Sequence, residues 1–252
     1  MVDKIQLKKD MPKTAGIIII GDEILSGKIQ DDNAFFMARE LFAHGIHLNH
    51  ISVISDSIDE IAKEVEVFSH RYDFVFTSGG IGPTHDDVTI EGIAKAFHVR
   101  PVIDPTLRKI LEKRQGSLTK EQLKMAEVPE GAELFTDESL SFPLIRFRNV
   151  YIFPGIPQLL RKKFVALEKL FNEPVIRVRK VYLNTSESRI APLLNEIVST
   201  HLNVKIGSYP VLDNDDYALM ITMESLNGSA LDIAVQSLIE RVSREVLVRV
   251  EG

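Results

Sequence analysis

The chain has 252 residues, of which 44% are hydrophobic and 26% are charged, the composition of an ordinary globular protein with a sizeable core. Its formal net charge of −6 argues against a general nucleic-acid-binding protein, and the absence of cysteine excludes disulfides, thiol catalysis and cysteine-ligated metals. The first residues are polar and lysine-rich, unlike a signal peptide, and no apolar run approaches the roughly 20 residues that span a bilayer. We therefore expect a soluble, cytoplasmic protein that binds neither nucleic acid nor membranes.

The first part of the chain alternates apolar runs with stretches of helical periodicity. Residues 14–20, a β-branched run that ends in four isoleucines, predict a central parallel strand covered on both faces. Further strands are predicted at residues 47–54 and 72–78, and helices at residues 33–44, 58–68 and 90–97. Asp32 or Asn33 is expected to cap the first helix, and Ser57 with Glu60 forms a predicted capping box for the second. This β-α-β-α-β-α order predicts an α/β fold with a doubly wound, mostly parallel sheet.

Three loops with acidic residues or glycines follow the three predicted strands. They contain Asp22, Glu23, Asp32 and Asn33 after the first strand, Asp56 after the second, and residues 79–87 after the third. Because the carboxyl ends of parallel strands meet at one edge of a sheet, we expect the three loops to form a single site. In the alternative interpretation, the carboxylates of the first loop are solvated and Asp56 is a turn or helix-entry residue.

Residues 76–89, FTSGGIGPTHDDVT, form the most distinctive stretch of the chain. Gly79, Gly80 and Gly82 let the backbone bring its N–H groups close to a ligand, and a loop that leads into a helix favours phosphate. Asp86 and Asp87 would repel a bare phosphate, so a divalent cation between the carboxylates and the phosphate is expected. The alternative is an ordinary helix start, with Asp87 as N-cap or first-turn acid and the glycines turning the chain.

The pattern beyond residue 98 is less regular. It predicts helices after Pro105 and within residues 118–126, and two short strands at residues 142–147 and 149–153. The second of these strands leads into a Pro154-Gly155 turn and a helix with Pro157 in its first turn. The basic run 161–163 on that helix is interpreted as a solvated face, with contact to an acidic ligand as the alternative.

The segment Asn172-Glu173-Pro174 predicts a domain boundary, with one domain over residues 1–172 and a second over residues 173–252. Strands are expected at residues 175–183, 204–209, 217–223 and 246–250, and helices at residues 186–201 and 229–242. This β-α-β-β-α-β order is that of a small ferredoxin-like α+β domain. Nothing in it predicts chemistry, so we expect it to serve in packing and in an interface.

Three motifs together resemble a known family. They are GDEILSG at residues 21–27 with Asp32-Asn33, SGGIGPTHDDVT at residues 78–89, and FPGIP at residues 153–157. They are similar to the MoaB/MogA-type molybdopterin-binding fold, within it to the CinA-like branch, and most to the molybdopterin-binding-like domain of eukaryotic FAD synthase. The resemblance covers essentially the whole chain. CinA proteins carry an Asn…Gly-x-Ala-Pro pattern before the Pro-Gly motif, whereas residues 139–147 here read SLSFPLIRF, as in the FAD-synthase type.

The resemblance implies several functions. Molybdenum-cofactor members bind the pterin and use acidic residues that match Asp56 and Asp87 in adenylyl transfer or metal insertion. Members of the CinA and FAD-synthase branches resemble divalent-metal-dependent pyrophosphatases that act on ADP-ribose or FAD. FAD synthase makes FAD in a separate C-terminal domain; this chain stops at Gly252, so we expect it not to make FAD by itself unless it is a fragment of a longer protein. The family also implies a homo-oligomer.

We therefore predict a divalent-metal-dependent nucleotide pyrophosphatase that uses Mg²⁺, Mn²⁺ or Co²⁺ to hydrolyse the diphosphate of FAD or an ADP-ribose-like dinucleotide. The predicted catalytic residues are Asp87, Asp86 and Asp56, and the predicted metal ligands are Asp22, Glu23 and Asp87. The predicted substrate-binding residues are Gly79, Gly80, Gly82, Thr84, Asp32, Asn33, Pro154 and Gly155. His85 is either an acid or base beside them or a polar surface residue.

The main alternative is a non-catalytic module that binds molybdopterin or a flavin nucleotide and regulates a FAD synthase or a molybdenum-cofactor pathway. A third hypothesis, molybdenum-cofactor biosynthesis itself, agrees less well with the FAD-synthase-type segment.

Overall fold

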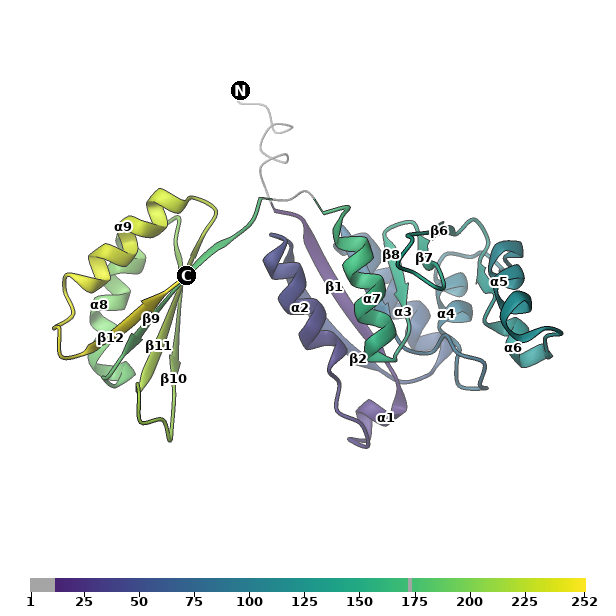
Figure 1. Ribbon diagram of the computed structural model, residues 1–252, viewed down its shortest axis with the longest axis horizontal. Helices are drawn as coiled ribbons and strands as arrows, with labels where there is room; N and C mark the ends of the chain where they lie inside the picture. The colour runs from purple at the N-terminus through teal and green to yellow at the C-terminus, as the bar shows by residue number, and fades with distance from the viewer. Residues whose placement is uncertain (1–11, 172–173) are drawn as a thin grey trace, which may run out of the picture. The chain divides into compact units, whose positions relative to one another are not determined.

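A computed structural model describes residues 12–171 and 174–252 (Figure 1). Contacts divide the chain into two compact units, Met1–Glu173 and Pro174–Gly252, each with its own sheet. The expected domain boundary between residues 172 and 173 falls on residues outside the described ranges. No helix within these ranges is long and apolar enough to cross a bilayer.

The larger unit is built on a six-stranded sheet with the strand order β2-β1-β3-β8-β7-β6. The strands are β1 (Thr14–Ile20), β2 (His47–Ile54), β3 (Phe74–Ser78), β6 (Glu133–Phe135), β7 (Leu144–Phe147) and β8 (Val150–Phe153). The first four strands in this order pair in parallel, whereas β7 and β6 continue the sheet in antiparallel pairs. The predicted mostly parallel α/β sheet is confirmed.

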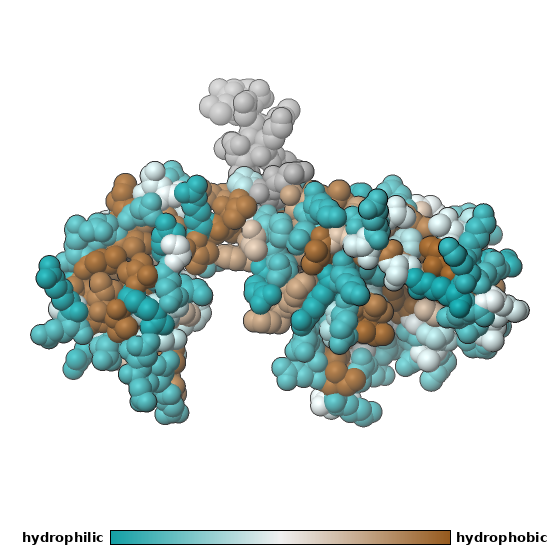
Figure 2. Space-filling model, viewed as in Figure 1, coloured by the Kyte–Doolittle hydropathy of each residue, from teal (hydrophilic) through white to brown (hydrophobic). Residues whose placement is uncertain are grey.

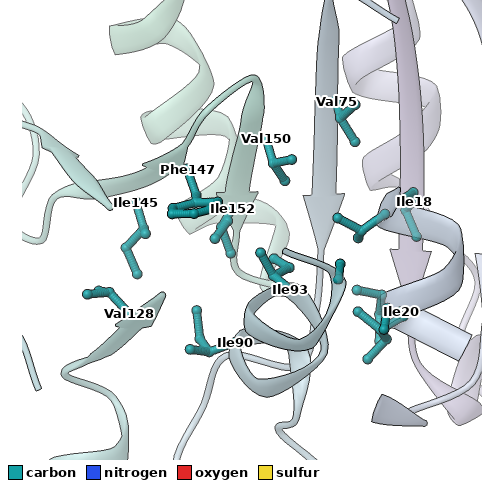
Figure 3. Packing of buried hydrophobic residues seen from close by; sticks show 14 of the residues in the cluster. Ile18, Ile20, Val75, Ile90, Ile93, Val128, Ile145, Phe147, Val150 and Ile152 are labelled. Carbon is teal, nitrogen blue, oxygen red and sulfur yellow. The ribbon is translucent and has the colours of Figure 1, made fainter. Parts of the chain in front are cut away.

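Helices cover both faces of this sheet, which gives three layers (Figure 1). They are α2 (Asn33–Ala43) and α7 (Pro157–Glu168) on one face, and α3 (Ile58–Arg71), α4 (Thr89–Ala96) and α5 (Pro105–Gln115) on the other. The isoleucines of β1 alternate between the layers: Ile17 and Ile19 pack toward α2 and α7, and Ile18 and Ile20 toward α3 and α4 (Figure 3). Burying both faces explains the unbroken apolar run, since each fully buried isoleucine contributes about 2 kcal/mol.

Several short elements were not predicted. They are the helical turn α1 (Asp22–Leu25), the strand β6, and an antiparallel pair of β4 (Pro101–Ile103) with β5 (Glu127–Pro129), which joins the segments on either side of α5 and α6 (Lys120–Lys124). Elements of three or four residues contain too few positions to show a periodicity, so tertiary pairing decides them.

Neither predicted helix cap forms the expected side-chain hydrogen bonds. Asp32 occupies the N-cap position of α2, as predicted, but its side chain makes no capping hydrogen bond; the carboxylate that accepts hydrogen bonds from the N–H groups of Asn33 (3.1 Å) and Ala34 (3.0 Å) is that of Asp31. The expected capping box of α3 is absent because Glu60 bonds instead to the hydroxyl of Ser55 (2.6 Å). In both cases a second side chain close in sequence can make the same kind of hydrogen bond, and residue spacing alone does not show which of the two side chains makes it.

The smaller unit has the predicted ferredoxin-like order. It comprises β9 (Arg177–Leu183), α8 (Glu187–Thr200), β10 (Lys205–Pro210), β11 (Leu219–Ser225), α9 (Gly228–Ile239) and β12 (Leu247–Glu251). The sheet order is β10-β11-β9-β12, with every neighbouring pair antiparallel. Apolar residues of α8 and α9 form its core with the strands. Polar residues cover most of the surface of each unit on the face shown in Figure 2.

Candidate functional site

A cavity of about 690 Å³ lies at the carboxyl ends of the parallel strands β1, β2, β3 and β8. Of the predicted site residues, eleven line it: Glu23, Asp32, Asn33, Asp56, Gly79, Gly80, Gly82, Asp86, Asp87, Pro154 and Gly155. Asp22, Thr84 and His85 are not among the lining residues. The parallel topology thus brings the three loops together, as expected from the position of each loop after a strand.

The glycine-rich loop after β3 has a conformation that side chains would disturb. Gly79 and Gly80 have positive φ angles of 109° and 64°, and a Cβ atom at Gly79 would lie 2.1 Å from the carbonyl oxygen of Ile20. The buried Thr89 fixes the loop, because its hydroxyl donates to the Gly79 carbonyl (2.9 Å) and its N–H donates to the Gly80 carbonyl (2.9 Å). Glycine is therefore needed here for close backbone approach.

The next three backbone N–H groups have no hydrogen-bond partner in the part of the chain that the structure describes. Across residues 12–171 and 174–252, no acceptor bonds the backbone N–H of Gly80, Ile81 or Gly82, and all three residues line the cavity and are partly exposed. Gly80 also contacts the start of α4 through its carbonyl, which accepts the N–H of Thr89, the first residue of that helix. Successive backbone N–H groups of a glycine-rich loop form an anion-binding site, so the loop suits a phosphate group.

A group of carboxylates forms another part of the cavity. Burial raises the pKa of Asp56, and the charges of Glu23, Asp22 and Asp86 raise it further, while the hydrogen bond from the N–H of Asp22 (2.9 Å) lowers it. Because these neighbours repel a second negative charge, Asp56 takes up a proton more readily than an ordinary aspartate. The same repulsion favours a cation among them.

Asp87 has a different role, because its carboxylate closes the loop. It accepts hydrogen bonds from the N–H (2.8 Å) and the hydroxyl (2.5 Å) of Thr84, and a Cβ atom on Gly82 would lie 2.6 Å from it. Val88 occupies the N-cap position of α4, so the alternative of Asp87 as helix cap is wrong. The Thr84 side chain is directed at Asp87, and the His85 side chain is 98% exposed.

Asn33 connects three of the loops. Its side chain is 5% exposed, and its amide donates to the hydroxyl of Ser78 (3.0 Å) and to the carbonyl of Gly155 (2.7 Å). The Ser78 hydroxyl in turn donates to the Pro154 carbonyl (3.3 Å). The loops after β1, β3 and β8 are thereby held in one arrangement around the cavity.

The basic part of the cavity agrees with the alternative given for the run 161–163, because Lys162 and Lys163 line the cavity. Lys163, expected on a solvated helix face, is only 8% exposed and donates to the carbonyls of Phe142 (2.8 Å) and Pro143. Burial lowers its pKa to about 8. The signal was its spacing, three residues after Leu160 and four before Leu167, which places it on the buried stripe of α7. Lys162 is exposed as expected and lines the cavity, as do Arg114 and Lys124.

The remaining wall is apolar. Its lining side chains include Leu111, Met125, Phe142, Ile145, Ile156 and Leu159. An anion-binding loop, a carboxylate group and an apolar wall in one cavity suit a ligand that joins phosphate to a ring system.

The carboxylates do not form a ready-made metal site. Within residues 12–171 and 174–252, the only three metal-ligating side chains with ligand atoms all within 4.8 Å of one another are Glu40, His44 and Glu168, outside the cavity. The charge around Asp56 fits a divalent cation, but an ion there needs further ligands from phosphate or water. The ligand set Asp22, Glu23 and Asp87 stays a prediction.

Comparisons with known proteins identify relatives of both units. Residues 16–177 match the family described as "Probable molybdopterin binding domain", and residues 176–251 match "FAD synthase, middle domain". A "Probable FAD synthase" of Caenorhabditis elegans is 32% identical over 264 residues, which cover 93% of this chain and 51% of that protein. The chain thus spans about half the length of this relative.

Two archaeal proteins match over most of their own length. A protein of Archaeoglobus fulgidus is 38% identical over 195 residues, which cover 77% of this chain and 84% of the relative. The crystal structure of CinA from Thermoplasma acidophilum, described as a protein of unknown function, is 33% identical with a TM-score of 0.59. The matched region covers 64% of this chain and 98% of that structure.

Proposed function

Because the chain belongs to the family of probable molybdopterin binding domains and also carries a FAD synthase middle domain, we propose that its cavity binds and hydrolyses a nucleotide diphosphate. Membership confirms the family resemblance of the three sequence motifs. The proposed activity is that of a divalent-metal-dependent pyrophosphatase acting on FAD or an ADP-ribose-like dinucleotide. The observation that carries the proposal is the run of three free N–H groups, from Gly80 to Gly82, on the cavity wall.

The diphosphate would bind at the glycine-rich loop. The N–H groups of Gly80, Ile81 and Gly82 donate to phosphate oxygens. Lys162 and Arg114 supply positive charges on the cavity wall. The apolar wall around Phe142 and Leu159 packs against an isoalloxazine or adenine ring.

Asp56 is the proposed general base. Its raised pKa brings its basicity closer to that needed at neutral pH, and it lines the cavity. It takes a proton from a water molecule whose oxygen attacks one phosphorus atom. The bond from that phosphorus to the bridging oxygen breaks, and two phosphate monoesters form. Asp87 positions the loop through Thr84 and so acts as a positioning residue.

A divalent ion would be held by Glu23, Asp22 and Asp86, whose charges raise the pKa of Asp56. Asp86 replaces the predicted Asp87 in this proposed set because the Asp87 carboxylate accepts hydrogen bonds from Thr84. Such an ion, when bound, neutralises charge on the diphosphate and makes water more acidic. The protein's own contribution is to hold the phosphate groups against these carboxylates and to keep Asp56 partly buried.

A product assay tests the proposal. The purified chain is incubated with FAD, ADP-ribose or NADH, with Mg²⁺, Mn²⁺, Co²⁺ or chelator, and AMP release is measured. Asp56→Asn should lower turnover by about 100-fold or more, the loss expected for a general base. The control Asp232→Asn, a surface carboxylate of the smaller unit that pairs with Arg179, should have normal turnover.

Asp87→Ala separates chemistry from loop position. It should also lower turnover strongly, with a rise in KM that Asp56→Asn does not show, because the loop loses its tie to Thr84. Nucleotide binding without AMP release under any metal condition would overturn the pyrophosphatase. That result would favour a binding module for a flavin nucleotide or a pterin, a function that the dispersed arrangement of the carboxylates also permits.

A further inference from the structure

A second cluster of metal-ligating side chains lies at the carboxyl ends of α2 and α7, two helices on the same face of the sheet (Figure 1). Glu40 and His44 come from the end of α2, and Glu168 is the last residue of α7. One ligand atom from each lies within 4.8 Å of the other two. None of the three lines the cavity, and each side chain is about one-quarter exposed.

The imidazole of His44 is oriented toward Glu168. Its Nδ1 lies 2.8 Å from the carbonyl oxygen of Glu40, so Nδ1 carries the proton and donates it to that oxygen. Among residues 12–171 and 174–252 no donor bonds Nε2, which faces a carboxylate oxygen of Glu168 at 3.7 Å, beyond hydrogen-bond distance. The ring of Phe171 holds the imidazole from its edge, with centroids 5.7 Å apart. A histidine that ligates a metal is commonly fixed in this way through its other nitrogen.

The surroundings favour a cation. The carboxyl end of each helix carries about half a negative charge, and the last turns of α2 and α7 contain no basic residue to compensate it. Arg39 pairs with one oxygen of Glu40 (3.0 Å), which leaves the other oxygen of that carboxylate for a further partner.

We propose that Glu40, His44 and Glu168 bind a divalent transition-metal ion of the Zn²⁺ class. The ligands are Nε2 and one oxygen from each carboxylate, and water completes the coordination at this partly exposed position. An imidazole ligand selects Zn²⁺ over Mg²⁺, so this site differs in chemistry from the carboxylates around Asp56. The ion joins the ends of two helices whose opposite ends, at Asn33 and Pro157, line the cavity.

Calorimetric titration of the full, chelator-treated chain with Zn²⁺ alone tests the proposal. One ion should bind per chain, and the thermal midpoint should rise on binding. His44→Ala and Glu168→Gln should each weaken this binding by about tenfold or more, as the loss of a ligand requires. Circular dichroism checks that both variants keep the wild-type fold.

His70→Ala is the matched control. His70 on α3 makes the same Nδ1 contact with the carbonyl oxygen four residues earlier, that of Glu66 (2.8 Å), and it is not one of the three clustered ligands. Its substitution should leave Zn²⁺ affinity unchanged. Equal affinity in the wild type, His44→Ala and Glu168→Gln would overturn the proposal, and so would an absence of stoichiometric binding. Because no nucleotide is present, either result is independent of the pyrophosphatase assay.

Discussion

Replacing Lys163 by methionine should remove a pH dependence from the stability of the larger unit. Burial lowers the pKa of Lys163 from 10.5 to about 8. At about 1.4 kcal/mol per pKa unit, holding this ammonium group inside the protein costs roughly 3 kcal/mol. Between the two pKa values the unfolded chain binds more protons than the native chain, so this contribution to stability rises with pH. It is absent below the native pKa and fully gained above the unfolded pKa.

Urea unfolding, followed by circular dichroism at several pH values, measures this contribution. The free energy of unfolding of the wild type minus that of Lys163→Met should rise by roughly 3 kcal/mol from near neutral pH to about pH 10.5. Other titrating groups are shared by both proteins and cancel in the difference. Lys162→Met is the matched control, because Lys162 is the exposed neighbour on the same helix, and its difference should stay flat.

The change of this free-energy difference with pH tests the buried charge of Lys163 better than its value at one pH. Lys163→Met also leaves the carbonyls of Phe142 and Pro143 without their donor, at about 1–3 kcal/mol for each unsatisfied group. At neutral pH this loss opposes the relief of the desolvation cost, so a single measurement there contains two opposing contributions. A difference that stays flat from neutral to alkaline pH would show that Lys163 is not held charged in a buried position, and would refute the reasoning.

Three other substitutions test the frame of the cavity. Gly79→Ala should lower the free energy of unfolding by about 3 kcal/mol, because φ is 109° and the new Cβ atom would meet the Ile20 carbonyl at 2.1 Å. Gly27→Ala, with φ of 70° but no neighbour within 4 Å, should cost only about 1 kcal/mol in the same denaturant titration; equal costs would contradict the steric argument. Asn33→Ala should cost about 2 kcal/mol and weaken FAD binding in calorimetry, since it removes the link between Ser78 and Gly155; unchanged binding would argue against a shared site. Asp104→Ala should lower the free energy of unfolding by about 1 kcal/mol because α5 loses its N-cap. AMP release by this variant should stay normal, which would separate an effect on stability from an effect on function.

The sheet could be predicted from the sequence because its signals are redundant. The isoleucine run of β1 is apolar at every position, so it needs two covering layers, and the intervening helices supply them. Parallel pairing then places the loops after β1, β2 and β3 at one edge without any knowledge of side-chain contacts. The confirmed fold and the assembled loops therefore follow from the same pattern.

The partners of the polar side chains could not be predicted in this way. Lys163 lies on the apolar stripe of α7, but its neighbours Arg161 and Lys162 gave the whole run the appearance of a solvated face. Glu60 has two candidate partners within five residues, Ser55 and Ser57, and in the structure it accepts a hydrogen bond from Ser55. A hydrogen bond of this kind contributes only about 1 kcal/mol, so small differences in tertiary geometry determine which partner is chosen.

For the same reason, the sequence does not show which carboxylates are already hydrogen-bonded within the loops and which are available for chemistry. Asp31 and Asp87 both belong to acidic pairs in the sequence, yet their oxygens accept hydrogen bonds from nearby N–H groups and so shape the loops. Asp56 also accepts one N–H, from Asp22, but burial, together with the charges around it, raises its pKa. A carboxylate destabilised as an anion by burial and repulsion is a stronger base than an ordinary aspartate. The proposed chemistry therefore moves from the aspartate pair of the distinctive motif to the single aspartate after β2.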